Sequence, residues 1–490
     1  MTDEVVEPKI SQEEEEEADK EGMINIAFVG CGHGELNKIY NAIKQLKVKI
    51  DLLIVGGDFQ AVRNMYDLNC MSVPQKYRQL GDFADYYAGT KTAPMTTIFI
   101  GGNHEASSYM RELFYGGWAA RNIYYMGAAN VINFKGVRIG GLSGIWNENH
   151  YRTGHFERLP YSYSSVRSAY HIRQYEIQKL SNITGKIDIV LSHDWPAGIE
   201  HYGDLKELLH KKKHFESDVE RGELGSPPAM ALLKQIRPRN WLSGHLHVKF
   251  PAIVKHDRQP EEKSPESTLK TRAETQNSKD ETIADNQNKE EIELDIDTLG
   301  DDTMSTAPPT TETTDYVDAS QSEHLLAFDT GKAFPETRFL AMDKCVRGRQ
   351  FLQVVSIPGK KGANSNQGLT YDPEWLAITK AMAPYLVMDG RKLPDISKEA
   401  VDRDLAEAKK WVYENICQTG KLKIPFDFRK TAPVHKGMKY ENFKQQPQEY
   451  KNKQTQTFCD LIRIPNAIWS ASAVDRSSSS EDEKQRLEMT

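Results

Sequence analysis

The chain has 490 residues, of which 27% are charged and 38% are hydrophobic, and its formal net charge is −7. This length allows two or three domains with at least one sizeable core, but the polar average excludes a chain that is compact throughout. The net charge argues only weakly against a nucleic-acid partner, because the acidic residues are clustered in patches at 13–17 and 481–483.

The first ordered segment is expected to begin at Met23, after an acidic arm over residues 1–22 that is predicted to be disordered. The apolar run 24–29 then predicts a buried strand. A tight, glycine-rich loop follows this strand and carries Cys31 and His33.

Four later apolar runs repeat this pattern of a strand followed by polar residues. They are 51–55 before Asp58, 97–100 before Asn103 and His104, 187–191 before His193, and 240–242 before His245 and His247. A helix is predicted over 36–47, and 137–142 predicts a further strand without such residues. Near-continuous apolar runs are typical of strands buried on both faces. Because sites in layered α/β folds assemble at the carboxyl ends of strands, we expect these polar side chains to share one site.

The composition changes after residue 256, where Ser, Thr, Asn, Gln and acidic residues replace the aromatic ones. Residues 257–323 are predicted to form an acidic, disordered linker. Order is expected to resume at 324, with strands over 338–342 and 351–357 and helices over 371–385 and 398–418. Residues 468–490 are predicted to be a disordered tail with serines that could be phosphorylated.

The cysteines and the termini indicate where the protein works. Five cysteines, an odd number without a CxxC pair, do not form a disulfide framework, which favours a reducing compartment. The acidic N-terminus does not resemble a secretory signal, and the apolar runs are shorter than the ~20 residues of a membrane helix. We therefore expect a soluble, intracellular protein with no membrane partner.

Every polar residue at these strand ends is a possible metal ligand. Taken singly, each has a simpler interpretation: a histidine after a strand is usually a satisfied loop residue, and Asn103 to Glu105 could be a turn before a helix cap. The occurrence of five such loops in one chain favours a metal site. One bridging carboxylate with flanking imidazoles and an amide oxygen can hold two divalent ions about 3.5–4 Å apart, which polarise a phosphate and activate water.

The order of these motifs resembles the calcineurin-like metallophosphoesterase superfamily, and within it the RNA lariat debranching enzymes more closely. The segments that carry the closer resemblance are 30–36, 57–64, 101–107, 115–118, 191–196 and 245–250. The resemblance covers about 23–256 and resumes at 337–357 and 369–375. It implies an α/β (α+β sandwich) four-layer metallophosphoesterase fold, with a catalytic domain over 23–256 and a smaller debranching-enzyme domain over 324–467.

The resemblance also implies roles for individual residues. One metal position would use Cys31, His33, Asp58 and His247, and the other would use Asp58, Asn103, His193 and His245, with Asp58 bridging. His104 would protonate the leaving oxygen. The implied reaction is hydrolysis of the 2′–5′ phosphodiester at the branch point of excised intron lariat RNA, which places the protein in the nucleus.

Two positions depart from the wider superfamily. Cys31 stands where most members have Asp, and a thiolate favours Fe(II) or Zn(II) over Mg(II), with Mn(II) expected to support activity. The thiolate also leaves open whether both metal positions are filled. Ala61 stands where a second acidic residue is usual, which argues against a serine/threonine phosphatase.

Residues 143–173 are dense in aromatic and basic side chains, which suit the unstacked bases and diverging strands of a branched RNA. They also align with the lariat recognition loop of the debranching family. The candidate RNA-binding residues are Trp146, Tyr151, Arg152, His155, Phe156, Tyr161, Tyr163, Arg167 and Tyr170. The alternative is a Tyr-rich surface segment that packs on the domain. The lysines at 211–213 are interpreted as a solvated charge run, with RNA-backbone contact or nuclear import as the minority alternative.

Two other functions remain open from the sequence. The first is a generic metal-dependent nuclease of the same superfamily, and the second is a catalytically inactive scaffold. The closer motifs and Cys31 favour a debranching enzyme over the nuclease, and the retention of a competent ligand at every position argues against the scaffold. The acidic tails could recruit RNA-processing proteins.

Overall fold

The structure is a computed structural model that describes residues 22–256, 333–359, 368–437 and 444–469. The predicted disordered linker, and nearly all of the predicted arm and tail, lie outside these residues. All five cysteines are described and unpaired. No helix within the described ranges is both long and apolar enough to span a membrane.

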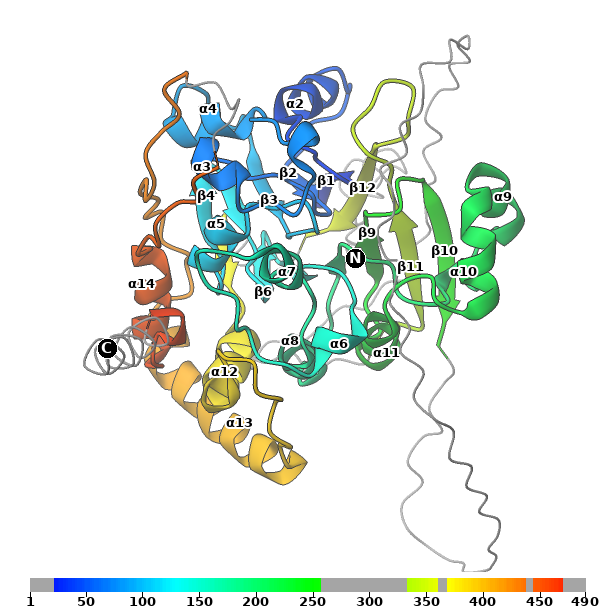
Figure 1. Ribbon diagram of the computed structural model, residues 1–490. Helices are drawn as coiled ribbons and strands as arrows, with labels where there is room; N and C mark the ends of the chain where they lie inside the picture. Colours follow the sequence, from blue (N-terminus) through cyan, green and yellow to red (C-terminus); the bar gives the residue numbers. More distant parts are fainter. Residues whose placement is uncertain (1–21, 257–332, 360–367, 438–443, 470–490) are drawn as a thin grey trace, which may run out of the picture. The chain divides into compact units, whose positions relative to one another are not determined.

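Two mixed β-sheets organise the described chain (Figure 1). The first sheet has the order β12 (Leu352–Pro358), β1 (Met23–Val29), β2 (Leu52–Val55), β3 (Thr96–Phe99), β5 (Ile123–Tyr125) and β4 (Gly117–Ala120). The second has the order β10 (Phe250–Lys255), β11 (Glu336–Ala341), β9 (Asn240–Ser243), β8 (Ile189–Ser192), β7 (Val137–Leu142), β6 (Ala129–Phe134) and β13 (Leu369–Tyr371). The mixed α/β fold that the sequence predicts is therefore confirmed.

The helices are mostly short. In chain order, the first are α2 (Leu36–Lys44), α3 (Met65–Leu68), α4 (Phe83–Ala88), α5 (Ser107–Glu112), α6 (Glu148–Tyr151), α7 (Tyr163–Ser168) and α8 (Gln174–Ser181). They are followed by α9 (Leu205–Lys211), α10 (Glu216–Arg221), α11 (Pro227–Ile236), α12 (Pro373–Met382), α13 (Lys398–Val412) and α14 (Lys453–Ile462). Single turns occur at Gln75–Tyr77, Ile199–Tyr202, Lys213–Phe215 and Ala383–Tyr385, and α13 continues as a π-turn over Tyr413–Cys417.

The alternation of side chains along β1 produces the layers. Ile26 and Phe28 point into the core between the two sheets, while Ala27 and Val29 pack with the apolar face of α2 on the other side. All four side chains are fully buried, so the strand is apolar on both faces, as its sequence predicts. Helices α8, α11 and α12 pack on the far side of the second sheet, which completes a helix–sheet–sheet–helix arrangement.

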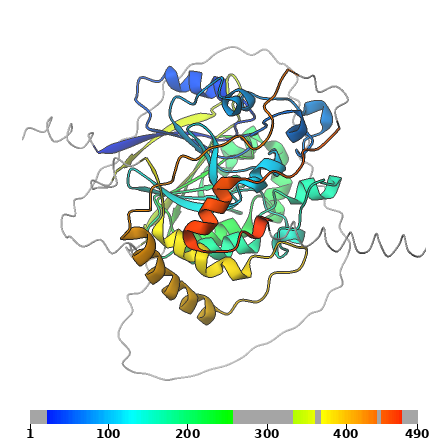
Figure 2. The same ribbon diagram turned by 90° about the vertical axis from the view of Figure 1, so that its left-hand side faces the viewer.

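The strands that the structure describes after residue 332 all join these two sheets. β11 lies inside the second sheet, antiparallel to β10 and parallel to β9, and β12 lies at the edge of the first sheet, antiparallel to β1. Figure 2 shows the yellow-green β12 running beside the blue β1, although they are far apart in sequence. Strands on either side of the undescribed segment 257–332 therefore share the same cores.

An ion-pair network fastens α12 to the second sheet. Asp372 caps the N-terminus of α12 and accepts two hydrogen bonds from Arg138 of β7, each at 2.8 Å. Arg138 also donates to Glu374 at 2.8 Å, and Glu374 accepts a further hydrogen bond from the backbone of Thr184 at 3.1 Å. The predicted helix over 371–385 is therefore two residues too long at its start, because Tyr371 ends β13 and Asp372 is the cap.

Candidate metal centre

The parallel strands bring their carboxyl ends to one place between the two sheets. β1, β2 and β3 are parallel neighbours in the first sheet, and β8 and β9 are parallel neighbours in the second. A side chain at Gly244, just after β9, would lie 3.0 Å from the backbone oxygens of Gly30 and Gly56, just after β1 and β2. The ends of the two sheets therefore approach so closely that a side chain at this position would force the backbone oxygens to shift.

One group of possible ligands comes from the β1, β2 and β9 loops. Single ligand atoms of Cys31, His33, Asp58 and His247 all lie within 4.8 Å of one another. The Nε2 atoms of His33 and His247 are 3.0 Å apart, and His33 Nε2 is 3.8 Å from Asp58 Oδ2. These four residues are the set that the sequence assigns to one metal position.

A second group gathers around the other oxygen of the same carboxylate. His193 Nε2 lies 3.3 Å from Asp58 Oδ1 and 3.2 Å from Asn103 Oδ1. The ring of His245 has its centre 5.0 Å from that of His193. The two oxygens of Asp58 thus face two different sets of donors, which is the arrangement that a bridging carboxylate requires.

Hydrogen bonding presents a lone pair of His193 to the centre. Its Nδ1 lies 2.8 Å from the backbone oxygen of Gly56, and an N–H must be donated there because a carbonyl only accepts. The other nitrogen, Nε2, faces Asp58 and Asn103, and in the neutral ring its lone pair is available to a cation there. A histidine that ligates a metal is usually oriented by a hydrogen bond of this kind.

The electrostatics favour an ionised carboxylate and, for three of the four ligand imidazoles, the neutral ring. His193 differs, because burial acts to lower its pKa but the charge of Asp58 raises it overall. Burial lowers the pKa of His33 to about 4 and that of His245 to about 3, and it also lowers the pKa of His247. Burial acts to raise the pKa of Asp58, but the imidazoles of His193, His104 and His33 hold it well below its usual range. Neutral imidazole and ionised carboxylate are the forms that bind a metal ion.

Cys31 fits a soft or borderline cation. Burial and the charge of Asp58 raise the pKa of its thiol well above the usual value, so an ionised sulfur needs a positive charge beside it. The backbone N–H of His245 already donates to Sγ, with N and Sγ 3.1 Å apart. The Nε2 atoms of His33 and His247 face each other 3.0 Å apart beside this sulfur, and a cation between the three atoms would be bound by all of them.

The backbone around these residues is strained. His33, Asp58, His245 and His247 all have positive φ, between 43° and 67°, although none of them is glycine. Non-glycine residues adopt this conformation at a cost of order 1–3 kcal/mol each, and they persist only where the surrounding structure holds them. Such residues cluster at functional sites, and here they are four of the proposed ligands.

Glu105 is a residue of the site to which the sequence assigns no role. Its buried carboxylate accepts hydrogen bonds from the backbone of Phe59 at 2.7 Å, Gln60 at 2.9 Å and Gly102 at 3.1 Å. It therefore ties the loop after Asp58 to the loop that carries Asn103 and His104. The sequence offered one signal for this role, because Glu105 directly follows His104. A carboxylate that is buried at such a position must accept hydrogen bonds.

His104 lies at the edge of the centre and is partly exposed. Its backbone N–H donates to Asp58 Oδ1 at 2.9 Å, and its ring centre is 5.5 Å from that of His33. All eight residues that the sequence assigns to the metal and acid roles are therefore brought together around Asp58.

The candidate RNA-binding residues are divided between the surface and the interior. Tyr163 is 74% exposed and lies under the guanidinium of Arg167, 4.3 Å from the ring centre. Trp146 and Tyr151 are partly exposed and meet edge to face, with ring centres 5.0 Å apart. Tyr161, in contrast, is buried.

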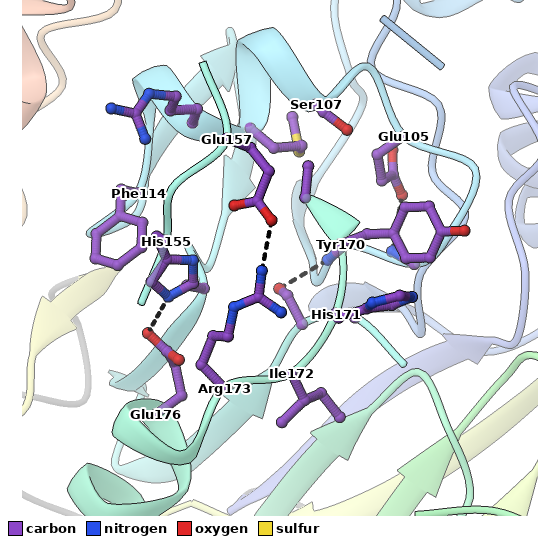
Figure 3. A pocket seen from close by; sticks show the side chains of 18 of the residues that line it. Glu105, Ser107, Phe114, His155, Glu157, Tyr170, His171, Ile172, Arg173 and Glu176 are labelled. Carbon is purple, nitrogen blue, oxygen red and sulfur yellow. Dashed lines mark hydrogen bonds and ion pairs between the residues drawn. The ribbon is translucent and has the colours of Figure 1, made fainter. Parts of the chain in front are cut away.

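A cavity of about 80 Å³ lies beneath this segment and reaches the glycines that precede Asn103. His155, Tyr161 and Tyr170 line it together with several buried charged residues. Figure 3 shows Arg173 reaching Glu157 and His155 reaching Glu176, at 2.6 Å and 3.0 Å respectively. Part of the segment over 143–173 therefore packs inward, as the alternative interpretation of its composition expects.

Comparison with known protein families divides the chain into an N-terminal and a C-terminal region, as the sequence predicts. Residues 24–249 match the family described as calcineurin-like phosphoesterase, and residues 334–467 match the family described as lariat debranching enzyme, C-terminal domain. Together these matches span most of the chain.

Several curated proteins are similar along nearly the whole length. The chain is 40% identical over 450 residues to a lariat debranching enzyme of Schizosaccharomyces pombe, covering 90% of this chain and 96% of the relative. It is 37% identical over 446 residues to one of Arabidopsis thaliana, covering 90% and 87%. It is 38% identical over 450 residues to one of Homo sapiens, covering 90% and 69%.

Proposed function

Because this chain belongs to the lariat debranching enzyme family, we propose that it hydrolyses the 2′–5′ phosphodiester at the branch point of excised intron lariat RNA. The products would be a linear RNA with a 5′-phosphate and a branch nucleotide with a free 2′-hydroxyl. The observation that carries this proposal is the convergence of eight predicted site residues around the single carboxylate of Asp58.

The donors favour specific ions. Cys31, His33, Asp58 and His247 would hold one divalent ion, and Asp58, Asn103, His193 and His245 would hold a second. A divalent ion held there supplies Lewis-acid polarisation of the phosphate and activation of water. The sulfur and nitrogen donors favour Fe(II) or Zn(II), and Mn(II) is expected to support activity.

The residues around the ions position the reacting groups. Glu105 accepts hydrogen bonds from three backbone N–H groups of the two ligand loops. These bonds fix the distance between the ligands that follow β2 and those that follow β3. His104, anchored by its backbone to Asp58, presents its imidazole at the open edge of the centre. From there a protonated ring would donate its proton to the departing 2′-oxygen, which becomes the free hydroxyl.

A substrate comparison tests the proposal. Protein prepared without oxygen and loaded with Fe(II), Zn(II) or Mn(II) is incubated with a synthetic branched RNA and with a linear RNA that has only 3′–5′ linkages. Selective cleavage of the branch supports debranching. Equal cleavage of both RNAs would instead support a generic nuclease, and failure to cleave either RNA or a chromogenic phosphodiester would support a scaffold.

The cellular setting is a further part of the proposal. An enzyme that acts on excised introns is expected in the nucleus, and the acidic segments of the chain could recruit RNA-processing proteins. Microscopy of the tagged full-length protein tests the location. A cytoplasmic signal that excludes the nucleus would contradict it.

A further inference from the structure

The loop between β11 and β12 brings the C-terminal region to the metal centre. Lys344 forms a parallel β-bridge with Cys31, and the backbone N–H of Cys345 donates to the Cys31 oxygen at 3.3 Å. A side chain at Gly30 would lie 2.8 Å from the backbone oxygen of Asp343. This loop, residues 343–349, is therefore packed directly against the first ligand loop.

The bridge determines the direction of the Lys344 side chain. Paired residues in a β-bridge project to the same side of the sheet, and Cys31 projects into the ligand group with His33 and His247. The electrostatics agree with this direction, because the positive charge of Lys344 acts to lower the pKa values of Cys31, His33 and His247.

The loop carries more positive than negative charge. It contains Lys344, Arg347 and Arg349 against a single acid, Asp343. Asp343 lies 3.5 Å from Arg349, so its charge is already partly matched. Among the residues that the structure describes, no carboxylate lies within ion-pair distance of Lys344 or Arg347. Lys344 is therefore a cation beside the centre that no described carboxylate matches, in a chain whose net charge is −7.

We propose that Lys344 is a phosphate-binding residue for the branched RNA, placed at the His33 and His247 edge of the centre by the C-terminal region. The inference rests on the proposed function, because it takes the substrate to be RNA. The contact is with a phosphate next to the one that is cleaved, on the strand that leaves the centre over loop 343–349. Lys344 is thus a positioning residue and not a ligand, and its partial exposure allows its ammonium group to reach such a strand.

Kinetics of the Lys344→Ala variant test this contact. A contact that is made equally before and during the reaction raises KM and leaves kcat unchanged. We expect KM for branched RNA to rise about five- to tenfold. The slope of log KM against log salt concentration should fall in magnitude by about 0.7, the value for one phosphate of a single strand.

Three controls separate substrate binding from a structural role. Lys344→Arg keeps the charge and should restore most of the affinity. Lys398→Ala removes an exposed lysine of α13, which pairs with Asp402, and should behave as wild type. Hydrolysis of bis(p-nitrophenyl) phosphate, which has no neighbouring phosphate, and the metal content should both be unchanged in Lys344→Ala.

Two results would overturn the inference. One is a KM and a salt slope for Lys344→Ala that equal those of the wild type. The other is a parallel loss of metal and of bis(p-nitrophenyl) phosphate hydrolysis, which would mean that Lys344 supports the ion and not the RNA. Failure of the proposed function would give a different result. Wild-type protein would cleave linear and branched RNA equally, whatever the kinetics of Lys344→Ala.

Discussion

At the scale of single residues, His104 is distinguished from the other histidines of the centre by how it is attached. Its contact with Asp58 is made by the backbone N–H, so the imidazole is not committed to the carboxylate. A substitution can therefore remove the ring without removing the hydrogen bond that orders the ligand loop.

His104→Ala is expected to lower kcat on branched RNA by at least about 10²-fold, the low end of a general acid contribution. The metal content and RNA affinity should be close to wild type, because the backbone contact with Asp58 remains. Single-turnover cleavage, elemental analysis and RNA titration measure the three quantities. Unchanged turnover would remove His104 from the mechanism.

His193→Ala is expected to at least halve the metal content. Its Nε2 faces both Asp58 and Asn103, and its loss leaves His245 as the single imidazole of the second group. Asn103→Ala should also lower the metal content. His214→Ala is the matched control, since His214 is exposed and outside the centre. Elemental analysis that finds full occupancy in His193→Ala would refute the ligand assignment.

At the scale of elements, the loops after short buried strands carry the chemistry, and charged contacts between helices and strands hold the layers together. Glu374 of α12 is the clearest case. Burial acts to raise its pKa, but Arg138, the Thr184 hydroxyl and Lys409 lower it to about 2. A depressed carboxyl pKa means that the ionised form stabilises the attachment of α12 to β7.

The pH dependence of stability follows from this shift. The contribution of Glu374 is fully present above its unfolded pKa of about 4.5 and is lost as the pH falls through about 2, for a total of about 3 kcal/mol. We expect Glu374→Gln to lower the free energy of unfolding at pH 7 and to lose less stability than wild type between about pH 5 and 3. Urea titrations of wild type, Glu374→Gln and the exposed Glu399→Gln control measure this. Parallel pH profiles for all three proteins would contradict it.

At the scale of the whole molecule, the two sequence-matched regions are parts of one folded unit. β11 lies between β10 and β9, so removal of the C-terminal region would expose backbone groups on both neighbours and open the core. A chain that ends at residue 332 is therefore expected to be largely insoluble, or unfolded by circular dichroism. A soluble fragment with full metal content would show that the N-terminal region folds alone.

The segment between β10 and β11 should be dispensable for catalysis. The two strands are antiparallel neighbours, and the His256 N–H donates to the Pro335 oxygen at 2.8 Å, so the chain leaves and re-enters the fold at one place. Deletion of residues 260–323 shortens the connection without stretching it, and a shorter loop costs less entropy to close. We expect at least about half of the wild-type kcat/KM on branched RNA, and a collapse of activity would contradict this.

Much of the site was predictable from sequence because it depends on local features. Apolar runs of strand length locate β1, β2, β3, β8 and β9, and the residue types after them identify the donors. Parallel strands then bring their ends together without further information. The ligand set and the α/β class needed no knowledge of distant contacts.

Other features were decided only by tertiary structure. The sequence predicts a strand at 338–342 but not that β11 would lie inside the second sheet, because strand pairing depends on contacts between segments far apart in the chain. For the same reason, composition could not separate buried Tyr161 from exposed Tyr163, or show that Lys344 adjoins Cys31. The residue types that can bind a metal and the apolar pattern of a strand can be read from short segments. Contacts between segments that are far apart in the sequence form only when the whole chain packs.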